Sequence, residues 1–475
     1  MVILVGTASK RVRCFQTISS FLFNKNNRFS ASAPTAIDTN CAADKFVMDK
    51  FKLPSRHEAG VYSVWIEFSQ LAVTTKCLNL GQGFPDYDPP SRFSDYLAQV
   101  ATEKNSFFNQ YTRGFGHARL VKALADLYSK LIDRKIDPMN EIMVTVGAYE
   151  ALYCAIQGNI EVGDEAIIIE PFYDCYEPMV RTAGGIPRFI PLRNTKPNAS
   201  TSHSSDWKLD PDELASLFNS KTKLIIINTP HNPLGKIFDY DELTMIANLA
   251  KKHNVLVISD EVYEWLVYKP TQHIRIATLP EMWQRTITIG SAGKTFSMTG
   301  WKLGWAYGPS YLMKNLCVVH QTAIYTCATT VQEAAARGFE HEIALLGTPN
   351  SYFQTLSDEL QPKMNYLFKI LQDGGFKPIM PEGGYFMIAD WTNFEDQLDL
   401  NSETDKYKDF RFVKWLSKNI KLQGIPYSAF YSEGNKRMAE NYLRFCFFKK
   451  DETLKKAENI LTTWTSSLPK KKSKL

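Results

Sequence analysis

Short runs of β-branched residues alternate with helical stretches from Glu165 onward, and this alternation constrains the fold more than any other feature of the chain. Four of the runs are apolar on both faces and end in small, polar or turn-forming residues, as strands do when they are buried inside a parallel sheet. They span residues 166–171, 223–230, 254–263 and 285–296. Because strands that alternate with helices form βαβ units with right-handed crossovers, we expect an α/β fold with a mostly parallel sheet.

A helix over residues 239–253 is predicted to join the second and third of these runs. Asp239 can cap its first turn together with Glu242, three residues later. Leu243 and Ile246 then fall on one apolar face of the helix. This segment therefore supplies the crossover of one βαβ unit.

The pattern changes after residue 345, which indicates a second unit. A long helical stretch over 348–375 is followed by extended segments at 383–391 and 442–450, as expected of a smaller α+β unit. Residues 198–206 are polar and predict a loop. The predicted divisions are a leader over 1–45, an N-terminal arm and part of the small domain over 46–90, a large domain over 91–345 and a small domain over 346–475.

Basic residues gather at the two ends of the chain and make the net charge of +5 misleading. Five lie in the first 37 residues, which contain no Asp or Glu, and four lie in the last six. Without these nine positive charges the net charge falls from +5 to −4, so a surface for nucleic acid is not indicated. No apolar run approaches the roughly 18 to 20 residues needed to cross a bilayer, so no membrane span is expected.

Both ends of the chain have the composition of targeting signals. Residues 1–36 are rich in Arg, Lys, Ser and Thr and contain no acids, which is typical of a mitochondrial transit peptide. A disordered extension without a destination is the alternative for the same composition. The chain ends in Ser473-Lys474-Leu475, which is a peroxisomal address. The two signals conflict; we favour a mitochondrial location, with peroxisomal or cytoplasmic location as the alternative.

The eight cysteines form no C-x-x-C pair. Their spacing indicates neither a zinc site nor a disulfide framework. We therefore expect reduced thiols with buried structural roles, and no bound metal.

Polar side chains stand where the predicted strands end. Asn232 follows one strand, and Asp260 and Tyr263 close the next. Lys294 follows the last strand. Because ligands of open α/β sheets bind at the carboxyl ends of the strands, we expect these groups to converge. A lysine and an aspartate at neighbouring strand ends suit pyridoxal phosphate, whose aldehyde forms a Schiff base with a lysine and whose ring nitrogen needs a carboxylate.

Two nucleotide-binding motifs are present only in part. The Gly293-Lys294-Thr295 sequence lacks the glycine that a P-loop requires five positions earlier, where Thr288 stands. Gly81 and Gly83 lack the third glycine of the dinucleotide fingerprint, because Asp86 occupies that position. Neither nucleotide site is therefore predicted.

Six motifs, in the expected order, strongly resemble the fold-type I aminotransferases, which depend on pyridoxal phosphate. NTPHNPLG, SDEVYEWLVY and SAGKTFSMTGWKLGWAYGP carry the general resemblance. LNLGQGFPDYDPP, NQYTRGFGHARL and EPFYDCYEP narrow it to the kynurenine and glutamine aminotransferase branch, which also has cysteine-S-conjugate β-lyase activity. The resemblance covers about residues 50–465 and implies a mostly parallel seven-stranded sheet in a large domain, with a smaller α+β domain.

The resemblance implies a role for each residue around the cofactor ring. Lys294 would form the Schiff base and then move the proton during catalysis. Asp260 would hold the ring nitrogen, with a helix N-cap as its alternative role. Tyr263 and Asn232 would hydrogen-bond the ring oxygen. Phe172 would stack on the ring, with simple core packing as the alternative.

The resemblance also implies the residues around the cofactor phosphate. Ser291, Lys302 and the turn formed by Ala148 and Tyr149 would make a cup of donors at the start of a helix. Tyr111 would reach the phosphate from the second subunit of a homodimer, with a packed aromatic as the alternative. The active site would then lie at a subunit interface.

Substrate recognition is implied at a further set of positions. Arg444 would pair bidentately with the substrate α-carboxylate, since the planar guanidinium matches that group better than lysine does. Gly83 would let the backbone approach the same carboxylate, and Asn232 would contact the substrate as well as the cofactor. The positions that match the side-chain pocket of this branch are Trp65, Tyr149 and Tyr325.

The segment IYTCATT refines the resemblance around Tyr325. It is similar to the mitochondrial subgroup of kynurenine aminotransferases. Some members of the branch carry His after the aromatic residue, whereas this chain has Thr326. That difference leaves the ranking of substrates open.

The predicted activity is transamination of L-kynurenine, glutamine, methionine or aromatic amino acids with a 2-oxo acid, by a pyridoxal-phosphate-dependent homodimer. The oxo acid formed from kynurenine would cyclise to kynurenic acid. One alternative is a lyase that eliminates pyruvate and ammonia from cysteine conjugates. Another is a non-enzymatic binding protein on a degenerate aminotransferase scaffold, which the presence of Lys294, Asp260 and Arg444 disfavours.

Overall fold

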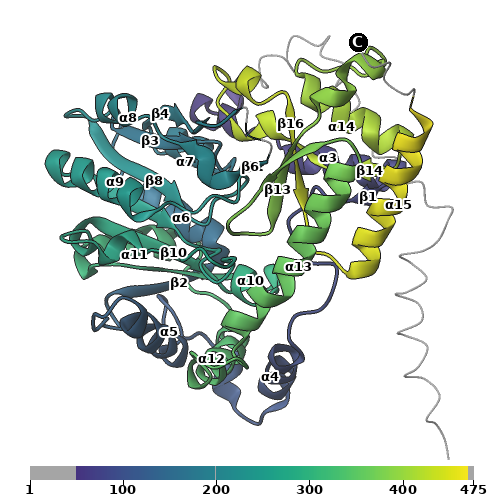
Figure 1. The fold of residues 1–475 in the computed structure, drawn as a ribbon. Coiled ribbons are helices and arrows are strands. Elements are labelled where there is room, and N and C mark those ends of the chain that lie inside the picture. Colours follow the sequence, from purple (N-terminus) through teal and green to yellow (C-terminus); the bar gives the residue numbers. More distant parts are fainter. Residues whose placement is uncertain (1–49, 198, 200, 469–475) are drawn as a thin grey trace, which may run out of the picture. The chain divides into compact units, whose positions relative to one another are not determined.

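The structure is a computed structural model that describes residues 50–197, 199 and 201–468 (Figure 1). The chain divides into two units, Met1–Pro54 and Ser55–Leu475, and the second contains every element discussed below. The predicted leader over 1–45 and the Ser473-Lys474-Leu475 tripeptide lie outside the described residues, so both targeting signals stay predictions. Each helix of the described part is too short or too polar to span a membrane.

Seven strands form the main sheet. In sheet order they are β2 (Ile142–Val146), β11 (Leu303–Tyr307), β10 (Thr286–Ser291), β9 (Leu256–Asp260), β8 (Thr222–Asn228), β3 (Glu165–Glu170) and β4 (Ile186–Pro191). β11 runs antiparallel to both of its neighbours, and the other adjacent pairs are parallel. The four predicted runs are confirmed as β3, β8, β9 and β10, so the α/β fold with a mostly parallel sheet is also confirmed.

Helices pack against this sheet because each presents one apolar face to it. α6 (Gly147–Gln157) lies on β2, β10 and β11, and α11 (Ser310–Ala323) packs against α6. α9 (Tyr240–His253) begins as predicted: the Asp239 side chain accepts from the Glu242 N–H at 2.9 Å, and the Glu242 carboxylate accepts from the Asp239 N–H at 3.3 Å. The predicted crossover helix is therefore confirmed.

A second sheet lies beside helices from the C-terminal part of the chain (Figure 1). In sheet order its strands are β15 (Ile425–Pro426), β16 (Tyr442–Cys446), β13 (Phe386–Asp390), β12 (Lys377–Met380) and β6 (Ser202–His203). The predicted extended segments at 383–391 and 442–450 are confirmed as β13 and β16. The predicted helix at 348–375 is confirmed as α13 (Tyr352–Asp373).

The remaining longer helices surround the two sheets. They are α3 (Val64–Thr75), α4 (Ser91–Thr102), α5 (Ala118–Leu131), α7 (Tyr176–Thr182), α12 (Thr329–Ala344), α14 (Lys408–Asn419) and α15 (Asp451–Ser467). α12 packs against α4 and α5, and α13 packs against α15 (Figure 1).

Two short strands, β6 and β1, pair with strands that lie far from them in the sequence. β6 lies within the segment predicted as a polar loop, yet it pairs with β12 in parallel. β1 (Leu78–Asn79) pairs in parallel with β14 (Leu422–Gln423). Strands of two residues carry no periodicity of their own, so the loop prediction was incomplete at β6. The division into a large and a small domain stays a prediction.

The cysteines agree with the predicted absence of a disulfide framework in the part of the chain that the structure describes. All six cysteines there are free, and four of them are buried. Their thiols therefore pack as small apolar groups.

The parallel register brings the ends of the central strands together. Asn228, the last residue of β8, pairs with Asp260, the last residue of β9. Asp260 also pairs with Ile289 of β10, two residues before Ser291. The carboxyl ends of three adjacent strands thus meet at one edge of the sheet, where a ligand site is expected.

Candidate active site

A cavity of about 320 Å³ opens at the carboxyl ends of β8, β9 and β10. Most of the predicted site residues line it: Trp65, Gly83, Ala148, Tyr149, Asn232, Asp260, Tyr263, Ser291, Lys294, Lys302 and Arg444. The main sheet and the second sheet both contribute, since Asp260 ends β9 and Arg444 lies in β16. The predicted convergence of these residues is therefore observed, and their roles stay predictions.

Lys294 projects its amine into this cavity from α10 (Ala292–Thr295), the short helix that follows β10. Ser291 caps α10, since its hydroxyl accepts from the Lys294 N–H at 3.3 Å. The amine donates to the Tyr385 hydroxyl at 2.6 Å and to the Gly83 carbonyl at 3.4 Å. Burial lowers the pKa of Lys294 to about 8, so a large part of the amine is uncharged in mildly alkaline solution.

Asp260 is buried at the end of β9. Tyr176 donates its hydroxyl to Oδ2 at 2.6 Å, and the Val262 N–H lies 3.4 Å from Oδ1. Burial nevertheless raises the pKa of Asp260 to about 6, because these hydrogen bonds do not replace the lost hydration. β9 leads into a turn and not into a helix, so the helix N-cap alternative for Asp260 is wrong. A cationic ligand group at this carboxylate would stabilise its charged form.

Arg444 is buried in β16 and forms no ion pair in the part of the chain that the structure describes, although the nearby Asp174 carboxylate favours its charged form. Its Nη1 donates to Asn232 Oδ1 at 2.9 Å and its Nη2 to the Gly81 carbonyl at 2.7 Å, while Nε has no hydrogen-bond partner. Burial lowers the pKa of Arg444 to about 10. A buried guanidinium at a cavity wall that forms no ion pair with any described residue is suited to receive a carboxylate from a ligand.

The first turn of α6 forms the other end of the cavity. Gly147 has a φ of +72° and Gly304 leaves no room for a side chain, because a Cβ there would lie 2.4 Å from the Ala148 nitrogen. β11 can therefore approach the start of α6 closely. Ser291 and Lys302 line the same end, so the free amide groups of the helix, a hydroxyl and an ammonium face one space. This donor set suits a phosphate.

The chemistry of these groups fits pyridoxal phosphate. One end of the cavity suits its phosphate, and a buried carboxylate at the other end of the ring site suits its protonated nitrogen. An amine of lowered pKa faces the same space and suits its aldehyde. Arg444 remains for a second ligand that carries a carboxylate.

The prediction that Phe172 stacks on the cofactor ring is wrong. Phe172 is buried outside the cavity, where its ring stacks on Phe189 at a centroid distance of 5.6 Å and an interplanar angle of 19°. Its neighbour Tyr173 lines the cavity instead. Consecutive side chains of an extended segment point in opposite directions, so only one of the two adjacent aromatic residues can face the cavity. The prediction assigned this position to Phe172, whereas Tyr173 occupies it.

Tyr111 and Tyr325 lie outside the cavity of their own chain. Both are exposed, at 83% and 55%, and their rings pack edge to face at a centroid distance of 5.6 Å. Tyr325 has a φ of +70°, a conformation that is unusual for an aromatic residue. Within a single chain, the prediction that Tyr325 lines the substrate pocket is therefore not met.

Several residues of the cavity were not predicted from the sequence. They are Gln82, Phe84, Gly147, Leu152, Tyr173, Asn228, Val262, Gly293, Thr299, Leu303 and Phe386. Asn228 donates its Nδ2 group to the Asp260 carbonyl at 2.9 Å and accepts the Asn232 N–H at 2.7 Å, so it joins two strand ends. Its position near the end of the predicted strand over 223–230 was the signal that could have identified it. Tyr385, which contacts Lys294, had no such signal.

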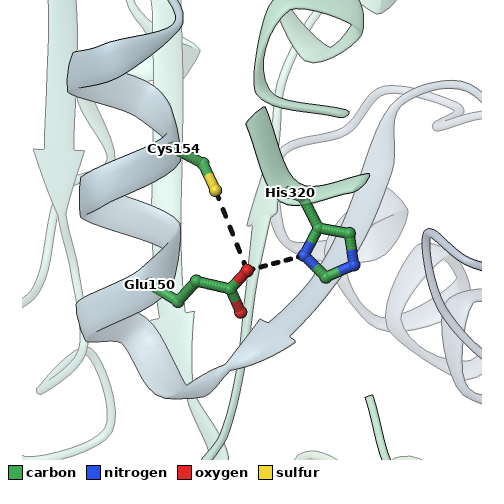
Figure 2. A group of neighbouring side chains, drawn as sticks. All are labelled: Glu150, Cys154 and His320. Atoms are coloured by element: carbon green, nitrogen blue, oxygen red, sulfur yellow. Dashed lines mark hydrogen bonds and ion pairs between the residues drawn. The ribbon is translucent and has the colours of Figure 1, made fainter. Parts of the chain in front are cut away.

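A buried cluster behind the phosphate end anchors α6 to α11. Figure 2 shows Glu150 and Cys154, one turn apart on α6, directed toward His320 on α11. Glu150 Oε1 lies 2.7 Å from His320 Nδ1 and 3.9 Å from Cys154 Sγ. Since the Gly114 carbonyl can only accept, His320 Nε2 donates to it at 2.9 Å.

This cluster has the residue types of a metal site, and its ligand atoms lie within 4.8 Å of one another. Hydrogen bonds account for its arrangement, however. Glu150 Oε2 accepts the Val146 N–H, Oε1 is shared with His320, and the other ring nitrogen of His320 is bonded to Gly114. The cluster therefore ties the first turn of α6 to the segment that carries Tyr111.

The match to known proteins extends over most of the chain. Residues 75–461 match the family described as aminotransferase class I and II. Kynurenine–oxoglutarate transaminase 3 from Homo sapiens is 50% identical over 96% of this chain and 97% of its own length. Kynurenine–oxoglutarate transaminase 1 from Mus musculus is 47% identical over 87% of this chain and 98% of its own length.

Solved structures agree with this match. Bna3p from Saccharomyces cerevisiae, described as a candidate kynurenine aminotransferase, superposes with a TM-score of 0.81 and is 31% identical. The superposition covers 87% of this chain and 99% of Bna3p. YbdL from Escherichia coli, for which a methionine aminotransferase function is described, has a TM-score of 0.75 at 30% identity, over 87% of this chain and 99% of YbdL.

The rate at which the apoenzyme captures pyridoxal phosphate is expected to rise with pH through about 8, because only an uncharged amine attacks an aldehyde. Burial lowers the pKa of Lys294 to about 8, so the rate should increase about tenfold per pH unit below that value and level off above it. Stopped-flow absorbance of the covalent adduct measures the profile, with a simple alkylamine as the reference. A rate that keeps rising to the ordinary lysine pKa would contradict this expectation.

His320→Leu is expected to raise the dissociation constant of pyridoxal phosphate about tenfold, roughly 1.4 kcal/mol, because Glu150 and the Gly114 carbonyl lose their shared partner next to the first turn of α6. Equilibrium titration of the apoenzyme measures the change. Cys154→Ala is the matched control: it alters the same cluster but removes only a weak thiol contact at 3.9 Å. Equal effects of the two substitutions would show that cavity formation, not the histidine link, disturbs the site.

Proposed function

The chain belongs to the class I and II aminotransferases, and on this premise we propose that it is a homodimeric transaminase that uses L-kynurenine as an amino donor. The observation that carries the proposal is the buried guanidinium of Arg444, which forms no ion pair among the described residues and shares a cavity with the Lys294 amine. An amino acid has a carboxylate that can pair with Arg444 and an amine that can react with the cofactor aldehyde next to Lys294. A 2-oxo acid has the same carboxylate and serves as the amino acceptor.

Aminotransferases of this family use pyridoxal phosphate. When it is bound, the cofactor supplies an aldehyde that condenses with amines and a ring that withdraws electrons from the substrate α-carbon. Ser291, Lys302 and the amide groups at Ala148 and Tyr149 would hold its phosphate. Asp260 would keep its ring nitrogen protonated.

The side chains of this protein would then do the remaining work. Lys294 would take up the proton of the substrate α-carbon and give it up again, which its lowered pKa favours. Asn232 accepts a hydrogen bond from Arg444 through Oδ1, so its Nδ2 group would be the donor to the ring oxygen. Tyr263 is buried next to Lys294 and offers a second donor to the ring oxygen. Burial raises the pKa of Tyr263, which keeps its hydroxyl protonated.

Aromatic residues in the cavity support a bulky donor side chain. Trp65, Tyr149, Tyr173 and Phe386 all line it, and Trp65 is fixed by its indole N–H, which donates to Asp174 at 2.8 Å. These surfaces suit the anthranoyl ring of kynurenine and also phenylalanine, methionine or glutamine. The names of the human and mouse relatives support kynurenine in particular. Its oxo acid would cyclise to kynurenic acid.

The homodimer is proposed on the basis of Tyr111 and Tyr325. Two exposed aromatic rings that pack on each other form an apolar projection, which a second subunit can cover. We propose that this pair enters the cavity of the second subunit, where Tyr111 would reach the phosphate and Tyr325 the substrate side chain. Each cavity would then be complete only in the dimer.

The test of the cofactor and the donor is the absorbance spectrum of the purified protein before and after L-kynurenine is added without an acceptor. We expect a cofactor band that kynurenine converts to the aminated form, and no covalent cofactor in Lys294→Ala. A band that kynurenine leaves unchanged would remove kynurenine from the proposal. Release of pyruvate and ammonia from a cysteine conjugate without any oxo acid would instead identify β-elimination.

Arg444→Lys is expected to lower kcat/KM for L-kynurenine about 100-fold, roughly 2.7 kcal/mol, because one ammonium cannot replace a bidentate guanidinium. The control is kynuramine, the analogue that lacks the α-carboxylate, whose slow reaction should change little. Steady-state kinetics with both donors separate the two effects. An equal loss for both would mean that Arg444 supports the fold of the cavity and not carboxylate binding.

A further inference from the structure

The amine of Lys294 has a hydrogen-bond partner in the second sheet. Tyr385, directly before β13, lies with its hydroxyl oxygen 2.6 Å from Lys294 Nζ. The same hydroxyl donates to the Gly83 carbonyl at 2.9 Å. Because a carbonyl can only accept, the hydroxyl proton points to Gly83, and the oxygen lone pairs of Tyr385 remain to accept from the lysine.

The position of this hydroxyl is fixed by packing. Tyr385 is 1% exposed, and its ring packs on Tyr263, Phe386 and Phe448 at centroid distances of 5.1, 4.6 and 5.2 Å. Burial raises the pKa of Tyr385 well above its ordinary value, so the group stays neutral over the working range of pH. Tyr385 is therefore a fixed, uncharged acceptor for the lysine and not a base.

Lys294 makes the contact with Tyr385 through its free amine. With the cofactor and an amino acid bound, the Lys294 amine would be free and would have to stay close to the substrate α-carbon. When it takes up the α-proton it becomes an ammonium with three N–H groups. Tyr385 and the Gly83 carbonyl, at 2.6 and 3.4 Å from Nζ, supply acceptors for two of them.

Resting on the proposed function, we propose that Tyr385 is a further catalytic residue, which receives the released Lys294 amine and holds it for proton transfer. The α-carbon would lose its proton to the uncharged amine, and the bound cofactor would accept the electron pair of the broken bond. The Tyr385 oxygen and the Gly83 carbonyl would stabilise the charged amine, which becomes uncharged again when it gives the proton up. Tyr385 keeps its own hydroxyl proton throughout, and this proton stays hydrogen-bonded to the Gly83 carbonyl.

Tyr268 provides a matched control. Its hydroxyl donates to the carbonyl of Gly384, the residue before Tyr385, at 2.5 Å, and it is buried as completely as Tyr385. Tyr268→Phe and Tyr385→Phe thus each remove one buried hydroxyl that is bonded to a glycine carbonyl. Only the second removes a contact with Lys294.

The experiment measures the first half-reaction in a single turnover, with α-protiated and α-deuterated L-kynurenine. Tyr385→Phe is expected to slow it about 10- to 100-fold and to raise the deuterium isotope effect, since a charged hydrogen bond is lost in the proton-transfer step. The dissociation constant of pyridoxal phosphate should stay within about twofold of the wild-type value, because Tyr385 does not line the phosphate end. Tyr268→Phe should leave both the rate and the isotope effect near wild type.

A second measurement uses the apoenzyme and does not depend on the substrate. The pH profile of pyridoxal phosphate capture reports the pKa of Lys294, and Tyr385→Phe should shift its midpoint below the wild-type value of about 8, because the ammonium loses an acceptor. An unchanged midpoint, or a rate loss no larger than that of Tyr268→Phe, would overturn the role of Tyr385. If kynurenine fails as a donor, the apoenzyme profile still tests Tyr385. If the wild type captures no cofactor, both the proposed function and this inference fail.

Discussion

The site depends on burying three ionisable groups around one cavity, and none of them forms an ion pair within the part of the chain that the structure describes. Asp260, Lys294 and Arg444 each lose hydration there. Burial raises the pKa of Asp260 and lowers the pKa values of Lys294 and Arg444, so it favours the uncharged form of each group. Such groups are costly in a folded protein unless something compensates them. The apolar core of the two sheets provides the stability that offsets this cost, and a cofactor and substrate of complementary charge would relieve it. The arrangement of these groups therefore favours the binding of ligands that carry complementary charges.

The sequence predicted those parts of the fold and site that depend on local pattern. Continuous apolar runs identified β3, β8, β9 and β10, since strands buried on both faces need no polar alternation. Once the strands were parallel, their carboxyl ends had to meet, and the positions of Asp260 and Lys294 followed. The Asp239 cap was equally local. The motif resemblance added Arg444, which lies far from these residues in the chain.

The parts that escaped prediction depend on contacts between distant segments. Phe172 and Tyr173 are adjacent aromatic residues, and only the packing of Phe172 on Phe189 decides which of them faces the cavity. β6 has two residues and exists because β12 offers it an edge. Tyr111 and Tyr325 are exposed, and the roles proposed for them require a second chain.

Tyr385 also depends on contacts between distant segments. The segment from Gly81 to Gly83 connects it with Arg444. The Gly81 carbonyl accepts from Arg444, and the Gly83 carbonyl accepts from Tyr385 and Lys294. A Cβ at Gly81 would lie 2.7 Å from the Gly424 carbonyl oxygen, and one at Gly83 would lie 2.4 Å from the Phe386 ring, so the backbone reaches these partners only through glycine. One three-residue segment therefore contacts both Arg444, for which carboxylate binding is proposed, and Lys294, for which proton transfer is proposed.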